Sequence, residues 1–342
     1  MMVLNTGGAA LKHSDHTWAL ILGAGDGRRL SDLTGSATGR AVPKQFCSLR
    51  GGSSLLQETI ERAGGLASRD HISVILSETH RRWWQDAGLD LPAENIVVQP
   101  ANRGTAIGIL LQLLCVLERD PAAEVVLLPS DHHVADEGIL QAALRRALEL
   151  VRRAPERVVL LGMTPEGPDP ELGYMVPGAP DDSGAPAVRE FVEKPSPRRA
   201  RDLIAQGALW SPFILVARGQ TLLARIEECL PAIVQALRDA RRARGGSGAD
   251  LARLYERLPT LDFSHHVLTI SPGAALSVVA VPACGWSDLG TPERLGQTLS
   301  RLTPQPPDVP DRAPDAHVPV NLAARYYARH ESGACGRTSH PG

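Results

Sequence analysis

Short apolar runs alternate with longer helical segments along most of this chain, and this alternation restricts its fold more than any other feature. The runs are rich in Val, Ile and Leu, and most are continuous, as expected of strands covered on both faces. Strands are predicted at Trp18–Leu22, Ile72–Ser77, Ile96–Gln99, Glu124–Leu128, Val158–Leu161, Val188–Val192, Phe213–Val216 and Leu276–Val281. Helices are predicted at Ser53–Gly64, Thr105–Leu117, Glu137–Arg153, Pro197–Gln206 and Gln220–Arg244. The alternation predicts an α/β fold with one mainly parallel, doubly wound, Rossmann-like sheet.

Composition divides the chain into one large domain and two tails. Residues 1–16 predict a flexible N-terminal tail, and residues 17–302 carry all the predicted strands and helices. Residues 303–342 begin with a proline-rich stretch and contain too little apolar material for a second domain. We therefore expect residues 303–342 to be a disordered tail.

Charge and cysteine usage exclude several classes of protein. A formal net charge of -2 offers no basic surface for nucleic acid or for an anionic membrane. The five cysteines are scattered without a C-x-x-C pair, which predicts a reducing, cytoplasmic location and argues against a zinc site. No segment has the pattern of a signal peptide or of a membrane-spanning helix. We expect small-molecule substrates, and association between copies of the chain stays open.

The first predicted strand ends in a glycine-rich turn that is followed by cationic side chains. Glycines let backbone N–H groups approach phosphate oxygens, and arginine or lysine adds full positive charge. A dinucleotide fingerprint needs a glycine where Arg28 or Leu30 stands, and a Walker A loop needs a Gly-Lys pair that the chain lacks. We therefore predict a nucleoside triphosphate cradle, and a turn that binds nothing is the alternative. Its residues are Gly23, Ala24, Gly25, Gly27, Arg28, Arg29 and Lys44.

The loop after the third predicted strand carries residues that could bind a nucleotide base. They are Gln99, Arg103, Gly104 and Thr105, and they lead into a helix. Gly104 would let a flat base approach the backbone, whereas Thr105 could contact the ligand or cap the helix. A plain helix cap with a solvated Arg103 is an equally good reading of this segment alone.

Two aspartates and two further motifs also follow predicted strands. Asp131 and Asp288 each come after a buried strand, where a carboxylate can hold Mg²⁺ against phosphate oxygens. Asp131 could instead satisfy turn amides. The segments Gly173-Tyr174 and Glu193-Lys194 offer a backbone edge, an aromatic hydroxyl, a carboxylate and an ammonium for a sugar phosphate. An exposed Glu-Lys ion pair is the simpler reading of the last two.

Taken in order, these motifs resemble those of the sugar-1-phosphate nucleotidyltransferases, most closely the mannose-1-phosphate guanylyltransferases. The resemblance covers about Trp18 to Leu302. Arg28 stands where the family has threonine, Gly104 where its Arg-Asn-Thr-Ala motif has asparagine, and Ser211 where an asparagine lies near the sugar. The matching segments are Gly25–Leu30, Pro43–Phe46, Arg103–Ala106, Pro129–His132, Glu193–Pro195, Trp210–Phe213 and Gly285–Gly290.

The resemblance implies a single catalytic domain of the GT-A-like nucleotidyltransferase type that converts GTP and mannose 1-phosphate into GDP-mannose and pyrophosphate. It implies Mg²⁺ on Asp131 and Asp288, with Arg29 and Lys44 on the triphosphate. The sugar phosphate would be bound by Gly173, Tyr174, Glu193, Lys194 and Ser211. Two alternatives stay open: another base or sugar, such as glucose 1-phosphate with dTTP or UTP, and a non-catalytic protein that binds nucleotide sugars and regulates a partner.

Overall fold

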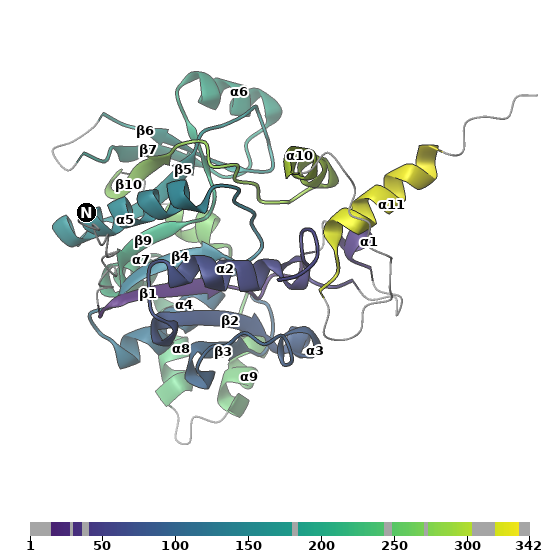
Figure 1. Ribbon diagram of the computed structural model, residues 1–342. Helices are drawn as coiled ribbons and strands as arrows, with labels where there is room; N and C mark the ends of the chain where they lie inside the picture. Colours follow the sequence, from purple (N-terminus) through teal and green to yellow (C-terminus); the bar gives the residue numbers. More distant parts are fainter. Residues whose placement is uncertain are drawn as a thin grey trace, which may run out of the picture.

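The structure, a computed structural model, describes residues 15–27, 30–35, 41–179, 184–242, 248–269, 273–302 and 319–334. These residues form a ten-stranded sheet with helices on both faces (Figure 1). The strands are β1 (Thr17–Leu22), β2 (Ile72–Ser77), β3 (Ile96–Gln99), β4 (Glu124–Pro129), β5 (Val158–Met163), β6 (Gly173–Pro177), β7 (Ala187–Val192), β8 (Leu209–Ser211), β9 (Leu215–Arg218) and β10 (Gly273–Val281). The α-helices are α1 (Ser31–Thr34), α2 (Leu55–Gly64), α3 (Arg81–Trp84), α4 (Thr105–Arg119), α5 (Glu137–Arg153), α6 (Pro197–Ala205), α7 (Gly219–Cys229), α8 (Pro231–Arg242), α9 (Gly248–Arg257), α10 (Pro292–Leu302) and α11 (Leu322–Ala334).

The sheet is mixed, so the predicted mainly parallel sheet is wrong in this respect. Its order is β10-β7-β6-β8-β5-β9-β4-β1-β2-β3. The half around β1 is parallel: β1 pairs with β2 and β4, and β2 pairs with β3. The other half is mostly antiparallel, and the parallel pairing of β10 with β5 closes β5, β8, β6, β7 and β10 into a five-stranded ring. The short strands β6 and β8 have no long apolar run, which is why the pattern missed them.

Two hydrophobic cores lie on the two faces of the sheet. Side chains of β1 alternate between them, because successive residues of a strand point to opposite faces. Ala19 and Ile21 pack with residues of α2 and α5, whereas Trp18 and Leu20 pack with residues of α4. Complete burial of a residue such as Leu20 contributes about 1.5–3 kcal/mol. None of the described helices is long and apolar enough to cross a membrane.

The helix predicted at Gln220–Arg244 is two helices, α7 and α8. Helix α7 ends at Cys229 and α8 begins at Pro231. Proline has no N–H and its ring clashes with the preceding turn, so it starts a helix readily but interrupts one. The break turns the chain so that α7 and α8 pack against each other on the face of the sheet that α4 covers.

Residues 319–334 have a regular structure within the segment that the sequence predicts to be a disordered tail. Ser48 N donates to Val320 O and Leu322 N donates to Ser48 O, both at 2.9 Å. Leu322 is fully buried, and α11 then extends away from the body of the molecule (Figure 1). The prediction of disorder is therefore wrong for these residues. Residues 303–318 and 335–342, and residues 1–14 of the predicted N-terminal tail, lie outside the described part.

Candidate active site

Backbone pairing brings the loops after β4 and β10 together at one end of the sheet. His133 N donates to Ser287 O and Ser287 N donates to His133 O, both at 2.9 Å. Two residues further on, Ala135 N donates to Cys284 O at 3.0 Å. Because these bonds join the two backbones, Asp131 and Asp288 occur on adjacent segments although they are far apart in the sequence.

Lys44 joins the two aspartate loops from a third direction. Its side chain is only 6% exposed, and its ammonium lies 3.0 Å from Asp131 Oδ2. The same Nζ donates to the backbone oxygen of Asp288 and lies 3.4 Å from Leu289 O. Leu289 is buried and has a φ of +47°, an uncommon value for a residue with a Cβ, so the surrounding structure holds this turn in place. Three of the four predicted catalytic residues therefore lie in one cluster.

The environment of Asp131 favours the charged carboxylate. Burial acts to raise the pKa of Asp131, but the Lys44 ammonium and its hydrogen bond bring the pKa below its ordinary value. Burial lowers the pKa of the neighbouring His132 to about 4, so this imidazole is neutral at pH 7. Trp286 Nε1 donates to His132 Nδ1 at 3.3 Å, and His132 Nε2 lies 3.6 Å from Asp131 Oδ1. Asp131 thus keeps a negative charge beside one cation and one neutral ring.

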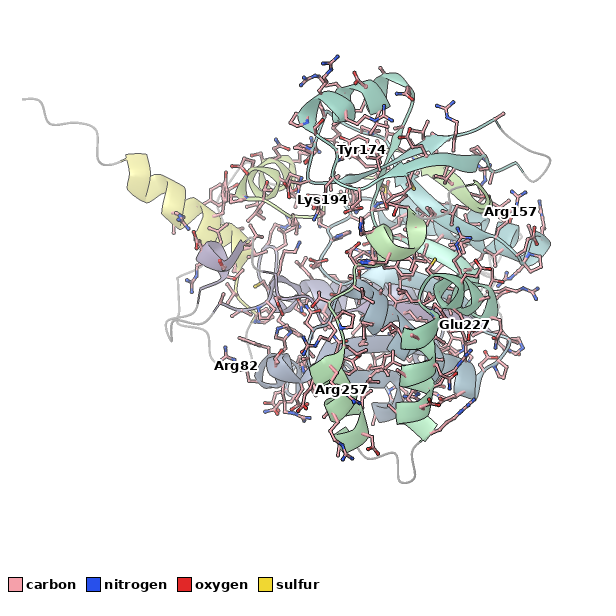
Figure 2. The ribbon with its side chains drawn as sticks, turned by 180° about the vertical axis from the view of Figure 1, so that it is seen from behind. Arg82, Arg157, Tyr174, Lys194, Glu227 and Arg257 are labelled. Atoms are coloured by element: carbon pink, nitrogen blue, oxygen red, sulfur yellow. The ribbon has the colours of Figure 1, made fainter. Side chains whose placement is uncertain are left out.

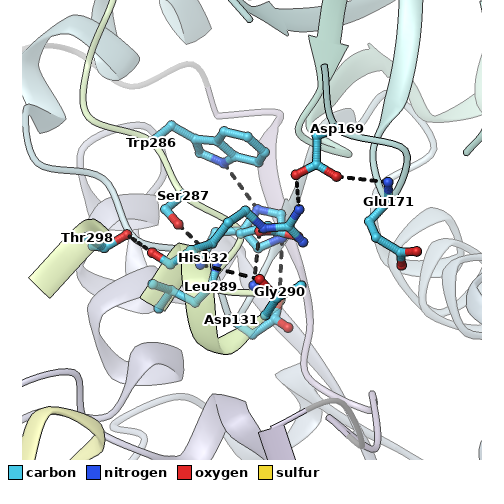
Figure 3. A network of polar contacts seen from close by, with 12 residues as sticks. Asp131, His132, Asp169, Glu171, Trp286, Ser287, Leu289, Gly290 and Thr298 are labelled. Carbon is cyan, nitrogen blue, oxygen red and sulfur yellow. Dashed lines mark hydrogen bonds and ion pairs between the residues drawn. The ribbon is translucent and has the colours of Figure 1, made fainter. Parts of the chain in front are cut away.

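Asp288 is held by an arginine that the sequence analysis did not identify. Arg294 Nε lies 2.7 Å from Asp288 Oδ1, and Arg294 Nη2 donates to Asp288 Oδ2 at 2.9 Å. Gly290 N adds a hydrogen bond to Asp288 Oδ1 at 3.0 Å. Arg294 also forms an ion pair with Asp169 in the loop before β6, in the network drawn in Figure 3. A basic residue in the first turn of α10 opposes the helix dipole, and this was the available sequence signal for a special role.

Asp131 and Asp288 are the two carboxylates here that could hold a magnesium ion together with a substrate. Mg²⁺ is usually bound by one or two carboxylates and completes its coordination with phosphate oxygens and water. Within the described residues no group of three or more His, Cys, Asp or Glu side chains could hold an ion by itself. Asp131 has a side chain that is 34% exposed, so it can still accept a further ligand. A metal ion on these two carboxylates would need further ligands, such as phosphate oxygens and water.

The glycine-rich loop lies directly against the Lys44 segment. Gln45 Nε2 donates to the backbone oxygens of Gly23 and Gly25, each at 2.8 Å. Gly27 has a φ of +61°, and a Cβ there would lie 2.8 Å from Lys44 N, so the close approach requires glycine. Ala24 is buried and Gly25 is exposed, while Arg28 and Arg29 lie outside the described residues. The predicted cradle is thus partly assembled around Lys44.

The residues predicted to contact a base are covered by the segment 255–263. Gln99 is buried and accepts from Tyr255 Oη at 3.3 Å, and Arg103 Nε donates to Tyr255 O at 2.7 Å. Thr105 Oγ1 accepts from Phe263 N at 2.8 Å. A Cβ at Gly104 would lie 2.2 Å from Leu261 O, so the backbone of Leu261 fills the space that the sequence analysis assigned to a base. In this structure the four residues therefore bind the chain itself.

Gly173, Glu193 and Ser211 come together as predicted for a sugar site. A Cβ on Gly173 would lie 2.8 Å from Glu193 Oε2 and 3.4 Å from Ser211 Cβ. Lys194 follows with an exposed side chain and a φ of +46° (Figure 2). These residues belong to β6, β8 and the end of β7, so the antiparallel pairing of these strands assembles the group.

Tyr174 does not join this group, so its predicted contact with the sugar is wrong for this structure. The residue is fully buried and packs with Leu172, Val176 and Leu203. Its hydroxyl accepts from Asp169 N at 2.8 Å and donates to Asp169 O at 3.0 Å. Tyr174 therefore fixes the loop that carries Asp169, the second partner of Arg294.

A cavity of about 550 Å³ opens beside the Arg294 network. Its walls are formed by the loop 166–172, by Trp210 and Trp286, and by residues of α10 between Glu293 and Arg301. Asp288 and Arg294 both line it, so one side of the network faces this cavity. The two tryptophan rings lie 6.4 Å apart, and Trp286 also touches His132.

The sequence and the structure were compared with known proteins. A sequence profile of the family described as nucleotidyl transferase matches residues 18–304. The chain is 31% identical over 282 residues to the xanthan biosynthesis protein XanB of Xanthomonas campestris pv. campestris (strain B100), which covers 80% of this chain and 57% of that protein. It is 30% identical over 292 residues to the mannose-1-phosphate guanylyltransferase of Escherichia coli (strain K12), which covers 80% of this chain and 58% of the relative.

A solved structure shows the same fold. The crystal structure titled mannose-1-phosphate geranyltransferase, from Thermus thermophilus, superimposes with a TM-score of 0.70 at 26% sequence identity. The match covers 83% of this chain and 79% of that one. By contrast, the chain spans less than two thirds of the length of the two curated relatives.

Proposed function

This chain belongs to the nucleotidyl transferase family, and from that premise we propose that it transfers a guanylyl group from GTP to mannose 1-phosphate. The products are GDP-mannose and pyrophosphate, and the proposed compartment is the cytoplasm. The observation that carries the proposal is the cluster in which Lys44 contacts Asp131 and the backbone of Asp288. The guanylyltransferase names of several relatives favour GTP and mannose 1-phosphate.

The reaction needs charge and alignment more than it needs acid–base chemistry. The phosphate oxygen of a sugar 1-phosphate is already anionic, so it can attack the α-phosphate of a nucleotide without a general base. The difficulty lies in bringing two polyanions together in line and in stabilising the charge that develops on the α-phosphate. The buried Lys44 ammonium is preorganised for this task because Asp131 and two backbone oxygens fix its position.

The remaining roles are assigned by position. Backbone N–H groups of the loop Gly23–Gly27 and the arginine Arg29 would hold the triphosphate. Asp131 and Asp288 would hold Mg²⁺, which when bound neutralises phosphate charge. Glu193, next to Gly173 and Ser211, would accept hydrogen bonds from sugar hydroxyls, and Lys194 would bind the sugar phosphate.

A substrate panel tests the proposal. Purified chain is incubated with Mg²⁺, either mannose 1-phosphate or glucose 1-phosphate, and one of GTP, CTP, dTTP, ATP or UTP, and pyrophosphate release is followed. We expect the highest kcat/KM with GTP and mannose 1-phosphate, and a preference for dTTP or UTP would refute the base assignment. Asp131→Asn should lower the rate by about a hundredfold or more. No activity in the wild type and in Asp288→Ala with any pair would instead favour a nucleotide-sugar-binding regulator.

A further inference from the structure

Arg294 bridges two carboxylates that come from different loops. On one side its Nη2 donates to Asp288 Oδ2 at 2.9 Å, and its Nε lies 2.7 Å from Asp288 Oδ1 without a hydrogen bond; on the other side its Nη1 forms an ion pair with Asp169. The side chains of Arg294 and Asp288 are only 14% and 13% exposed. A planar guanidinium with two such partners has little freedom to rotate, so it fixes the direction of the Asp288 carboxylate.

The far side of the bridge is itself fixed. Asp169 N donates to Tyr174 Oη at 2.8 Å, and Tyr174 Oη donates to Asp169 O at 3.0 Å. Tyr174 is fully buried in β6, so the anchor of Arg294 is part of the folded core. Figure 3 shows Asp169 and Asp131 on opposite sides of this network. Asp169 therefore fixes one end of the Arg294 guanidinium, and the other end of the same group contacts Asp288.

The charges in this cluster limit what it attracts. Lys44 and Arg294 supply two positive charges, and Asp131, Asp169 and Asp288 supply three negative charges. The charges of these five groups sum to one negative charge, which is a weak attraction for a divalent cation in competition with water. A nucleoside triphosphate would add several negative charges at the same place, so the metal is bound well only with the nucleotide.

We propose that Arg294 is a positioning residue that aligns Asp288 and offsets its charge, so that the chain binds a divalent metal tightly only together with nucleotide phosphates. The inference rests on the proposed function for the identity of the metal site. It predicts two separable effects of Arg294: its charge weakens metal binding to the free chain, and its planar fork supports turnover by orienting Asp288.

Direct binding of Mn²⁺, used as a probe in place of Mg²⁺, separates these effects. Free Mn²⁺ is measured by electron paramagnetic resonance in the presence of wild type, Arg294→Gln, Arg294→Lys and a control, Arg301→Gln. Arg301 lies on the same helix and pairs with Glu166 at an exposed position. Without nucleotide, Arg294→Gln should bind Mn²⁺ about tenfold more tightly than wild type, because a positive charge beside Asp288 is removed. Arg294→Lys and Arg301→Gln should stay near the wild-type affinity.

Turnover is the second measurement. Arg294→Gln and Arg294→Lys should both lower kcat about tenfold or more with a smaller change in KM for the sugar phosphate, because neither side chain has the planar guanidinium that contacts Asp288 and Asp169 at once. Asp169→Asn removes a negative charge and should weaken Mn²⁺ binding, which is the opposite sign to Arg294→Gln. Thermal unfolding checks that each variant is folded. If Arg294→Gln does not fold, Mn²⁺ binding by Asp169→Asn still tests the proposal.

The proposal is overturned if Arg294→Gln binds Mn²⁺ no more tightly than wild type and Arg301→Gln, or if Asp169→Asn changes the affinity in the same direction as Arg294→Gln. The binding measurement needs no catalytic activity. If the chain is inactive with every substrate pair, the proposed function is refuted. The Mn²⁺ affinities of the variants still decide whether Arg294 weakens metal binding.

Discussion

Replacing Gly104 with asparagine, the residue that the family motif carries there, is expected to destabilise the fold. Gly104 has φ +85° and ψ 169°, a combination outside the left-handed region that asparagine tolerates. Such backbone strain costs about 1–3 kcal/mol. A Cβ would also lie 2.2 Å from Leu261 O, which is a backbone atom that can yield only by moving the segment.

The movement has a cost that follows from the local hydrogen bonds. Leu261 N donates to Arg103 O and Ala106 N donates to Leu261 O, both at 3.0 Å. Weakening two such bonds costs about 1 kcal/mol each. Together with the strain, Gly104→Asn should lower the free energy of unfolding by about 3–5 kcal/mol, which for a chain of this size lowers Tm by about 4–7 °C.

Urea and thermal unfolding followed by circular dichroism measure this effect. Gly52→Asn is a matched control, because Gly52 has a φ of +88° but no atom within 4 Å of the Cβ position. The control should lose about 1–2 kcal/mol from backbone conformation alone. If Gly104→Asn is as stable as Gly52→Asn, or as the wild type, then Leu261 does not occupy the space above Gly104 and the reasoning is refuted.

Three further predictions concern single side chains. Lys44→Met should lower kcat about a hundredfold or more in the pyrophosphate assay, because it removes the ammonium that contacts both the Asp131 carboxylate and the backbone oxygen of Asp288. Activity within a fewfold of wild type would contradict this role. Tyr174→Phe should lower the free energy of urea unfolding by about 1–3 kcal/mol, since it leaves both backbone groups of Asp169 without their partner; an unchanged midpoint would argue against it. Burial lowers the pKa of His80 below the ordinary value, so the unfolded chain takes up a proton there first as the pH falls below about 6.5. The free energy of unfolding therefore falls as the pH falls. His80→Gln should make this free energy depend less on pH between about pH 5 and 7, and an equal slope in the variant and the wild type would refute the role of His80.

The sequence placed Lys44, Asp131 and Asp288 in one group more successfully than it described the sheet that carries them. Asp131 and Asp288 could be placed together because each follows a buried strand, and the carboxyl ends of such strands meet at one edge, where Lys44 also lies. An apolar run does not reveal the direction of its strand, so the antiparallel half was missed. The role of Arg294 could not be predicted in detail, because its ion pair with Asp169 depends on the distant loop before β6.

Two differences between the sequence predictions and the structure have simple physical reasons. Gly173 and Tyr174 are adjacent in one strand, so their side chains point to opposite faces and only one of them can face the sugar group. Gly104 shows the limit of reading glycine from sequence: the lack of a Cβ makes room for a ligand or for another part of the chain. Only the structure shows that Leu261 uses this room.

The hydrogen bonds between residues 320–323 and Ser48 and Leu49 affect the order in which the site can form during translation. Ser48 lies only a few residues beyond Lys44, and its N–H and C=O are both bonded to the segment at the start of α11. Early parts of a chain can fold while later parts are still on the ribosome. Here the support beside Lys44 is supplied by residues synthesised more than two hundred and seventy positions later. A nascent chain would therefore carry a nearly complete sheet before this loop reaches its final form.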